Sequence, residues 1–113
     1  MSSARRGEVW LVDLGMTAKV RPAVVLSVAT DESDRALVTL VPHTTSTRGS
    51  RFEATVMAPF LKTGAFDAQS LVTIPTVKLL RRLGVLGAPQ LADVEARVCA
   101  WLGLPIRTSS SGA

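Results

Sequence analysis

The chain contains very little of what metal sites and disulfide frameworks are made of. Its 113 residues include one cysteine, Cys99, and one histidine, His43. One cysteine excludes a disulfide within the chain, and the two residues are too few for a zinc site of four Cys or His ligands in one copy. They also exclude any acid–base mechanism that needs two histidines in one subunit. A lone cysteine is typical of a reducing compartment, so the sequence predicts a cytoplasmic protein.

The common catalytic motifs are absent as well. The sequence has no P-loop, no GxGxxG, no HExxH and no GxSxG. Its nine carboxylates are sparse, and no pair has the spacing of a glycosidase or a two-metal nuclease. The side chains that remain as candidates for catalysis are the guanidinium groups of arginine and the hydroxyls of serine and threonine.

No segment reads as a membrane span or as an address. The longest run without a charged residue, Ala36–Thr47, contains Thr, Pro and His and is well short of about 20 apolar residues. Arg5 and Arg6 resemble the start of a signal peptide, but Glu8 and Asp13 interrupt the stretch that would have to be apolar. We therefore expect no membrane contact.

Positive charge is the first feature present in excess. Thirteen basic residues against nine acidic ones give a net charge of +4. Most of the basic residues are arginine, whose guanidinium binds phosphate through two parallel hydrogen bonds and stays charged at any working pH. A small basic domain of this kind favours a polyanionic partner, nucleic acid first.

The hydrophobic pattern predicts one domain, with a core over residues 6–104 and a polar tail over 105–113. Pro42 is expected to stop the third strand because proline has no backbone N–H to donate. Ala58–Ser70 is expected to hold one helical turn. The predicted strands are Gly7–Leu14, Ala23–Ala29, Ala36–Val41, Phe52–Met57 and Leu71–Ile74, with Thr76–Leu80 continuing the last one and a further run at Leu83–Leu86.

The hydrophobic period changes near the C-terminus. Apolar residues recur on one face of a helix at Leu91, Val94, Val98, Trp101 and Leu102. Pro89 suits the first turn of this helix, and Gly103 is placed to end it. Five or six short strands followed by one helix predict a mainly β fold, a small and strongly curved sheet or barrel with a C-terminal helix.

The segment His43–Arg51 is the most polar part of the chain. It carries five hydroxyls, one imidazole and two arginines, and no acid follows until Glu53. Such a loop can satisfy phosphate oxygens and bases together, but composition alone favours an ordinary solvated hairpin loop. Beside Thr44, His43 could be a proton donor, but the sequence favours a packed or solvent-facing histidine.

Four segments together resemble one family. They are RGEVWLVDLG (Arg6–Gly15), RPAVVLS (Arg21–Ser27), VTLVPHTTS (Val38–Ser46) and the terminal helix that ends in Trp-Leu-Gly-Leu. In this order they resemble the MazF/PemK toxins of bacterial toxin–antitoxin pairs, over residues 6–104. The resemblance implies a small, twisted SH3-like barrel that is related to the CcdB fold and works as a homodimer.

The resemblance also implies an activity and a site. Many members cut single-stranded RNA at short sequences without a metal or other cofactor. Their catalytic arginine belongs to the R-P step, which is Arg21 here, and their catalytic threonine follows the third strand, which indicates Thr44. The further RNA contacts expected are Lys19, Thr45, Ser46, Arg48, Arg51 and Lys78.

The residues themselves are compatible with that chemistry. Attack by a ribose 2′-OH needs stabilisation of charge on the phosphorane, which a guanidinium beside the phosphate supplies. Arg21 is a poor general base because its pKa is very high, so its expected role is electrostatic, and Thr44 can donate a hydrogen bond to a non-bridging oxygen. Pro22 is expected to keep Arg21 extended. Without the resemblance, the residues favour the simpler interpretation, in which Arg21 is a surface residue at the edge of a strand and Thr44 is a loop hydroxyl.

The chain departs from the family at two places. Its first loop reads GMTAKVRP from Gly15 to Pro22, without the acidic residue and second glycine common in relatives. The contacts of that loop with RNA and the cut sequence therefore do not carry over. Lys78 stands where relatives often have an arginine, which keeps the charge but loses the two-pronged geometry.

The sequence therefore predicts an endoribonuclease toxin that is neutralised by an antitoxin with an acidic C-terminal tail. One alternative is a non-catalytic gyrase poison like CcdB, whose family depends on a Trp-Gly pair at the extreme C-terminus. Here Trp101-Leu102-Gly103 is followed by ten more residues. The other alternative is a non-catalytic RNA-binding barrel. Trp10 and Trp101 are expected in the core or at a dimer interface.

Overall fold

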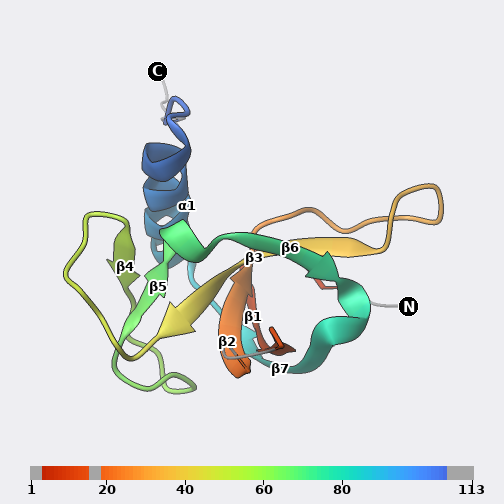
Figure 1. Cartoon of the computed structure of the whole chain (residues 1–113), viewed down its shortest axis with the longest axis horizontal. Coiled ribbons are helices and arrows are strands. Elements are labelled where there is room, and N and C mark those ends of the chain that lie inside the picture. Colours follow the sequence, from red (N-terminus) through yellow and green to blue (C-terminus); the bar gives the residue numbers. More distant parts are fainter. Residues whose placement is uncertain (1–3, 16–18, 107–113) are drawn as a thin grey trace.

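A computed structural model describes residues 4–15 and 19–106 of the chain as an antiparallel sheet with one helix at its C-terminal end (Figure 1). The predicted fold class, mainly β with a C-terminal helix, is confirmed. The predicted tail lies outside the described residues from position 107 onward, as do residues 16–18 of the first loop. The elements are β1 (Glu8–Asp13), β2 (Val20–Val25), β3 (Leu37–Thr44), β4 (Glu53–Thr55), β5 (Ala65–Asp67), η1 (Ala68–Ser70), β6 (Val72–Pro75), η2 (Thr76–Lys78), β7 (Leu79–Val85) and α1 (Ala88–Leu102).

The strands form one strongly bent sheet in the order β4-β5-β3-β2-β1-β7, and β6 pairs with β3 as well. Each of these pairings is antiparallel. Within the described part of the chain, no ladder joins the two ends of this order, so the sheet curls as expected of a barrel but does not close. Figure 1 shows α1 beside β4 and β5, on the side away from the hairpin that joins β2 and β3.

The prediction that Pro42 stops the third strand is wrong, because β3 continues through it to Thr44. The pairing of β3 with β6 ends at Leu40, and its pairing with β5 begins at His43. Pro42 therefore lies where β3 changes partners on that side, and its missing N–H is tolerated there. As a result, His43 and Thr44 belong to the sheet and not to a loop.

The second strand also differs from its prediction, since it begins at Val20 and not at Ala23. β1 holds the additional residues, because Asp13 pairs with Val20 and Val12 with Arg21. Arg21, Pro22 and Ala23 are all paired with β1. The ladder therefore fixes the backbone at Arg21 and on the far side of Pro22.

Other boundaries shift because the elements are short. β5 lies inside the segment predicted as irregular, and the helical turn expected there is η1. The fourth strand is shorter than predicted. Residues 76–78, expected to continue the strand before them, instead turn as η2 after Pro75, and β7 follows.

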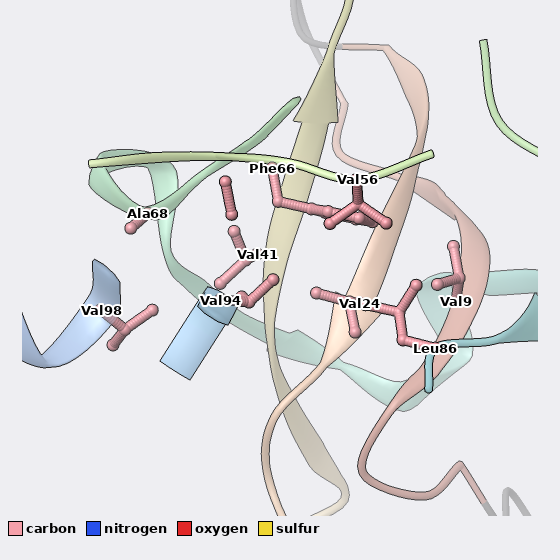
Figure 2. Close-up of a cluster of buried hydrophobic side chains, with 10 residues drawn as sticks. Val9, Val24, Val41, Val56, Phe66, Ala68, Leu86, Val94 and Val98 are labelled. Atoms are coloured by element: carbon pink, nitrogen blue, oxygen red, sulfur yellow. The ribbon is translucent and has the colours of Figure 1, made fainter. Parts of the chain in front are cut away.

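Two hydrophobic clusters lie on opposite faces of the central strands. The first cluster joins the sheet to α1, as Figure 2 shows, and the second fills the other face. Neighbouring residues of a strand point to opposite faces, so β2 contributes Val24 to the first cluster and Ala23 and Val25 to the second. The central strands are therefore buried on both faces and firmly positioned.

Helix α1 has the expected limits. The Gln90 side chain accepts a hydrogen bond from Gly87 N at 2.9 Å at its start, and Gly103, with φ of 71°, ends it in the left-handed conformation. Val94 and Val98 are buried, but the last turn projects beyond the sheet, and Trp101 is 43% exposed. Within residues 4–15 and 19–106, no helix is long and apolar enough to cross a membrane.

Candidate functional site

Arg21 and Thr44 are close neighbours across two adjacent strands. Ala23 pairs with Pro42 in the β2–β3 ladder, and two further steps of the same register place Arg21 opposite Thr44. Opposed residues of an antiparallel pair share a face, so both side chains project from the face of the second cluster. They lie at the edge where β2 begins and β3 ends.

Two clefts meet at this pair. The first cleft has a volume of about 350 Å³ and is mostly polar; its lining residues are Arg21, Pro42, Thr44, Ser46, Arg48, Ser50, Glu53, Asp67, Gln69 and Ser70. The second cleft has a volume of about 590 Å³; its lining residues are Leu11, Lys19, Val20, Arg21, Pro22, His43, Thr44, Thr45, Ser46, Phe60, Lys62, Arg81 and Leu83. Arg21, Thr44 and Ser46 border both clefts and so form the ridge between them.

The hydroxyl of Thr44 is oriented by its own loop. Its Oγ1 accepts a hydrogen bond from the backbone N–H of Ser46 at 3.0 Å. A hydroxyl has one proton to donate and two lone pairs. Since this bond occupies a lone pair, the proton of Thr44 remains available to donate to an oxygen bound at the ridge.

A single carboxylate organises the loop after β3. Glu53 accepts backbone hydrogen bonds from Arg48 at 3.0 Å, from Gly49 at 2.9 Å and from Ser50 at 3.3 Å. Gly49 has φ of 70°, the left-handed conformation that lets three successive N–H groups converge on one acceptor. The loop that carries Ser46 and Arg48 is thereby attached to β4.

His43 is a packed histidine. It is 4% exposed, and its ring meets the ring of Phe66 edge-on with centroids 5.1 Å apart. Burial lowers the pKa of His43, because the charged imidazolium loses its hydration. Its Nε2 is buried and has no hydrogen-bond partner within the described part of the chain. The ring is therefore neutral at neutral pH.

The structure gathers most of the predicted site residues. Ser46 and Arg48 line the first cleft with Arg21 and Thr44, while Lys19, Thr45 and Ser46 line the second. Lys19 has φ of 53°, an uncommon conformation for a residue with a side chain.

The two remaining predicted contacts, Arg51 and Lys78, line neither cleft. The guanidinium of Arg51 lies over the ring of Phe52, 4.6 Å from its centroid, and its carbonyl accepts a hydrogen bond from Arg97 at 2.8 Å. Lys78 is the last residue of η2. Both stay predictions as contacts with RNA.

Three residues of the second cleft are not evident from the sequence. Phe60 and Lys62 come from one segment before β5 and Arg81 from β7, and pairing of Arg81 with Leu11 of β1 brings Arg81 to the cleft that the other two line. Among the described residues, no group of three or more His, Cys, Asp or Glu side chains is arranged to hold a metal ion.

A sequence model of one protein family, described as the PemK-like, MazF-like toxin of type II toxin–antitoxin systems, matches residues 5–102 of the chain. Solved structures of similar fold agree. An endoribonuclease in complex with its cognate antitoxin from a mycobacterial species is 25% identical with a TM-score of 0.77, and the match covers 89% of this chain and 96% of that one.

Two further structures are similar over nearly their whole length. The Mycobacterium tuberculosis toxin MazF-mt6 is 27% identical with a TM-score of 0.71, covering 87% of this chain and 98% of that one. A MazE–MazF complex from Deinococcus radiodurans is 24% identical with a TM-score of 0.77, covering 93% of this chain and 100% of that one. At that identity, the last match shows the fold alone.

Proposed function

The chain belongs to the PemK-like, MazF-like toxins of type II toxin–antitoxin systems, and we propose that it is an endoribonuclease that cuts single-stranded RNA at the Arg21–Thr44 ridge. The observation that carries this proposal is the meeting of Arg21 and Thr44 across β2 and β3. The two residue types that the family resemblance assigns to catalysis face one another on a fixed sheet. A cleft extends from them on either side, which gives a strand of RNA a path across the ridge.

The chemistry proposed is an intramolecular displacement. The ribose 2′-oxygen attacks the neighbouring phosphorus, the bond from phosphorus to the 5′-oxygen breaks, and the 2′ proton ends on that leaving oxygen. The products are a cyclic 2′,3′-phosphate and a 5′-hydroxyl. Arg21 stabilises the negative charge that builds on the phosphorane, and the Thr44 hydroxyl donates to a non-bridging oxygen.

Cleavage of a long RNA in the presence of a chelator tests this function. The wild-type protein should give discrete fragments that end in a cyclic phosphate. Replacing the 2′-OH at the cut site by hydrogen should abolish cleavage and leave most of the affinity, because the phosphate contacts remain. Cleavage of this deoxy substrate would refute the 2′-OH mechanism.

Two variants assign the residues. Arg21→Ala should slow the chemical step by on the order of 10²-fold or more, the scale for loss of one preorganised charge stabiliser. Thr44→Val keeps the shape of the side chain, deletes the hydroxyl and should lower kcat far more than affinity. Cleavage by Arg21→Ala at the parental rate with saturating RNA would remove Arg21 from the mechanism. An RNA that binds the wild type without being cut would favour a non-catalytic RNA-binding protein.

We also propose that the protein acts in the cytoplasm as a homodimer, and that an antitoxin with an acidic tail neutralises it. One similar structure is an endoribonuclease in complex with its cognate antitoxin. A basic cleft built for RNA also suits an acidic, disordered segment that folds when it binds. The tail should therefore compete with RNA, and binding of both without loss of cleavage would contradict the idea.

The half-exposed Trp101 and Leu102 on the last turn of α1 give a second copy apolar surface to cover. Sedimentation should therefore give twice the chain mass of 12.0 kDa at micromolar concentration. A monomer under those conditions would count against the homodimer.

A further inference from the structure

The second cleft has an apolar floor that phosphate binding does not require. Leu11 of β1 pairs with Pro22 of β2, so both side chains lie on the face of the first cluster. Leu83 of β7, Val20 of β2 and Phe60, from the segment before β5, are the other apolar residues of the lining. A phosphate gains nothing from such a surface, whereas a flat apolar group is stabilised by it.

The rim of the same cleft is cationic. Lys19, Arg21, Lys62 and Arg81 border it, and none of the described residues that line it is a carboxylate. The first cleft differs, because Glu53 and Asp67 are part of its lining. The second cleft therefore suits a ligand whose outer part is anionic and whose inner part is planar and apolar, which describes a nucleotide unit of RNA.

The ring of Phe60 is placed by a glycine on the neighbouring strand. A methyl group on Gly84 of β7 would lie 2.3, 2.5 and 2.7 Å from three atoms of that ring, distances that no side chain tolerates. The ring therefore lies directly against the backbone of β7. Partly buried and packed against the first cluster, Phe60 presents a fixed aromatic surface at the cleft, the kind of side chain on which single-stranded bases stack.

The floor also contains a polar atom in need of a partner. His43 lines the second cleft, and its Nε2 is buried without a hydrogen-bond partner among the described residues. Buried polar groups without partners are rare in folded proteins. Because this nitrogen is buried, a base edge reaches it only if the imidazole ring turns toward the cleft when RNA binds, and a base can then satisfy it in either tautomer of the neutral ring.

From these contacts we propose that the second cleft is a nucleobase subsite, which holds the base next to the phosphate bound at Arg21 and Thr44. The base stacks on Phe60 above Leu11 and Leu83, beside His43. Lys62 and Arg81 bind the adjoining phosphate. The inference rests on the proposed function and adds to it a place where sequence preference is read.

An abasic scan of a bound RNA tests this subsite without relying on cleavage. The probe is the tightest binder among short RNAs whose riboses carry 2′-fluorine, which cannot attack the phosphate. One base at a time is removed, and Kd is measured by fluorescence anisotropy at fixed salt. Removal of one particular base should weaken binding by wild type about tenfold, the scale of one stacked base.

Matched aromatic variants locate that base. In Phe60→Leu, removal of the base at this one position should cost little affinity, and removal of bases at the other positions should have the same effect as in wild type. Phe52→Leu replaces an aromatic residue that also packs on the first cluster but lines neither cleft, and it should keep the wild-type profile. Lys62→Ser and Arg81→Ser should weaken all the RNAs alike and reduce the salt dependence, as expected for phosphate contacts.

Crosslinking of the wild-type protein covers the case in which Phe60→Leu does not fold. A 4-thiouridine at the sensitive position should attach to residues 58–62 of the tryptic peptide 52–62, located by fragmentation because that peptide also contains Glu53 of the first cleft. The proposal is wrong if wild type shows no position-specific penalty, if folded Phe60→Leu retains it, or if the crosslink maps only to residues of the first cleft. It is also wrong if the variants lose affinity only for the antitoxin tail, because the cleft is then a peptide site.

The two proposals fail separately. If removal of single bases changes Kd at no particular position while all-ribose RNA is still cut, the subsite is refuted and the endoribonuclease activity is not. A base-specific profile in a protein that cuts no RNA refutes the endoribonuclease alone.

Discussion

Gly64 lies against Thr44 so closely that a methyl group at position 64 would come within 2.1 Å of the Thr44 carbonyl oxygen. The same group would lie 2.8 Å from Cε1 of His43. Gly64 directly precedes β5, in which Ala65 pairs with Thr44. The end of β3 is thus positioned by a residue whose only contribution is the absence of a side chain.

Gly64→Ala should therefore impair catalysis through the backbone of Thr44. The strands must separate to admit the methyl group, which moves the hydroxyl away from the ridge. We expect kcat to fall on the order of 10–100-fold with a smaller change in KM, and unfolding to become easier by about 1–3 kcal/mol. Single-turnover kinetics and urea denaturation measure the two effects.

Gly87→Ala is the matched control for this change. A methyl group there would meet neighbours only at the ordinary distances of 3.7 and 3.8 Å, and the φ of −67° accepts a side chain. It should leave kcat unchanged. Equal losses of kcat in both variants would show that Gly64 has no particular role in placing Thr44.

Glu53→Ala should loosen the loop that carries Ser46 and Arg48. Three backbone N–H groups lose the carboxylate on which they converge, and water replaces it only partly. We expect a loss of about 1–2 kcal/mol in stability and a higher KM for RNA. Hydrogen exchange should be faster at positions 48–50, and Glu32→Ala, which removes an exposed acid from a different turn, should leave all three measurements at the wild-type level.

The burial of His43 predicts lower stability in weak acid. Its folded-state pKa lies below the ordinary value of 6.5, so the unfolded chain binds more protons as the pH falls through that value. The free energy of unfolding should therefore decrease from pH 7 toward pH 5, with a slope of at most about 1.4 kcal/mol per pH unit.

Because His43 is the only histidine, a single variant isolates this effect. His43→Gln removes the titrating group and should flatten the dependence of unfolding free energy on pH in that interval. Urea denaturation at pH 7, 6 and 5 provides the comparison. Wild-type stability that is constant or rises toward pH 5 would contradict the assignment.

Two arginines of one loop should behave differently. Arg48 lines the first cleft, whereas the guanidinium of Arg51 lies over Phe52. Arg48→Ser should weaken RNA binding and lower its salt dependence by about one counterion. Arg51→Ser should cost about 0.5–1 kcal/mol of stability and weaken RNA binding less than Arg48→Ser does. Titrations of both variants at several salt concentrations check this, and equal losses of affinity would place Arg51 in the RNA path.

The sequence correctly predicted those elements in which apolar residues recur with a clear period. Helix α1 and strand β1 have enough residues for their period to be visible, and Gly103 ends the helix as expected. Pro42 misled the prediction, because the effect of a missing N–H depends on which strand lies beside it. β5 has three residues, too few for a pattern.

The candidate site likewise has one part that the sequence predicted and one part that only the structure shows. Arg21 and Thr44 were predicted through short local segments, and the register of two neighbouring strands brings them together. Phe60, Lys62 and Arg81 meet only through the pairing of β7 with β1 and the close approach of Phe60 to Gly84. Such contacts join distant parts of the chain, so no local pattern indicates them.

The burial of β2 and β3 on both faces also limits how this protein can diverge. A substitution in either strand disturbs one hydrophobic cluster or the other, so a lineage has little freedom to alter the strands that carry Arg21 and Thr44. The segment 45–49 that follows β3 is exposed along its whole length and belongs to neither cluster. We therefore expect this segment to tolerate exchange better than the strands do, and grafting it between relatives should alter RNA binding while the positions of Arg21 and Thr44 stay unchanged.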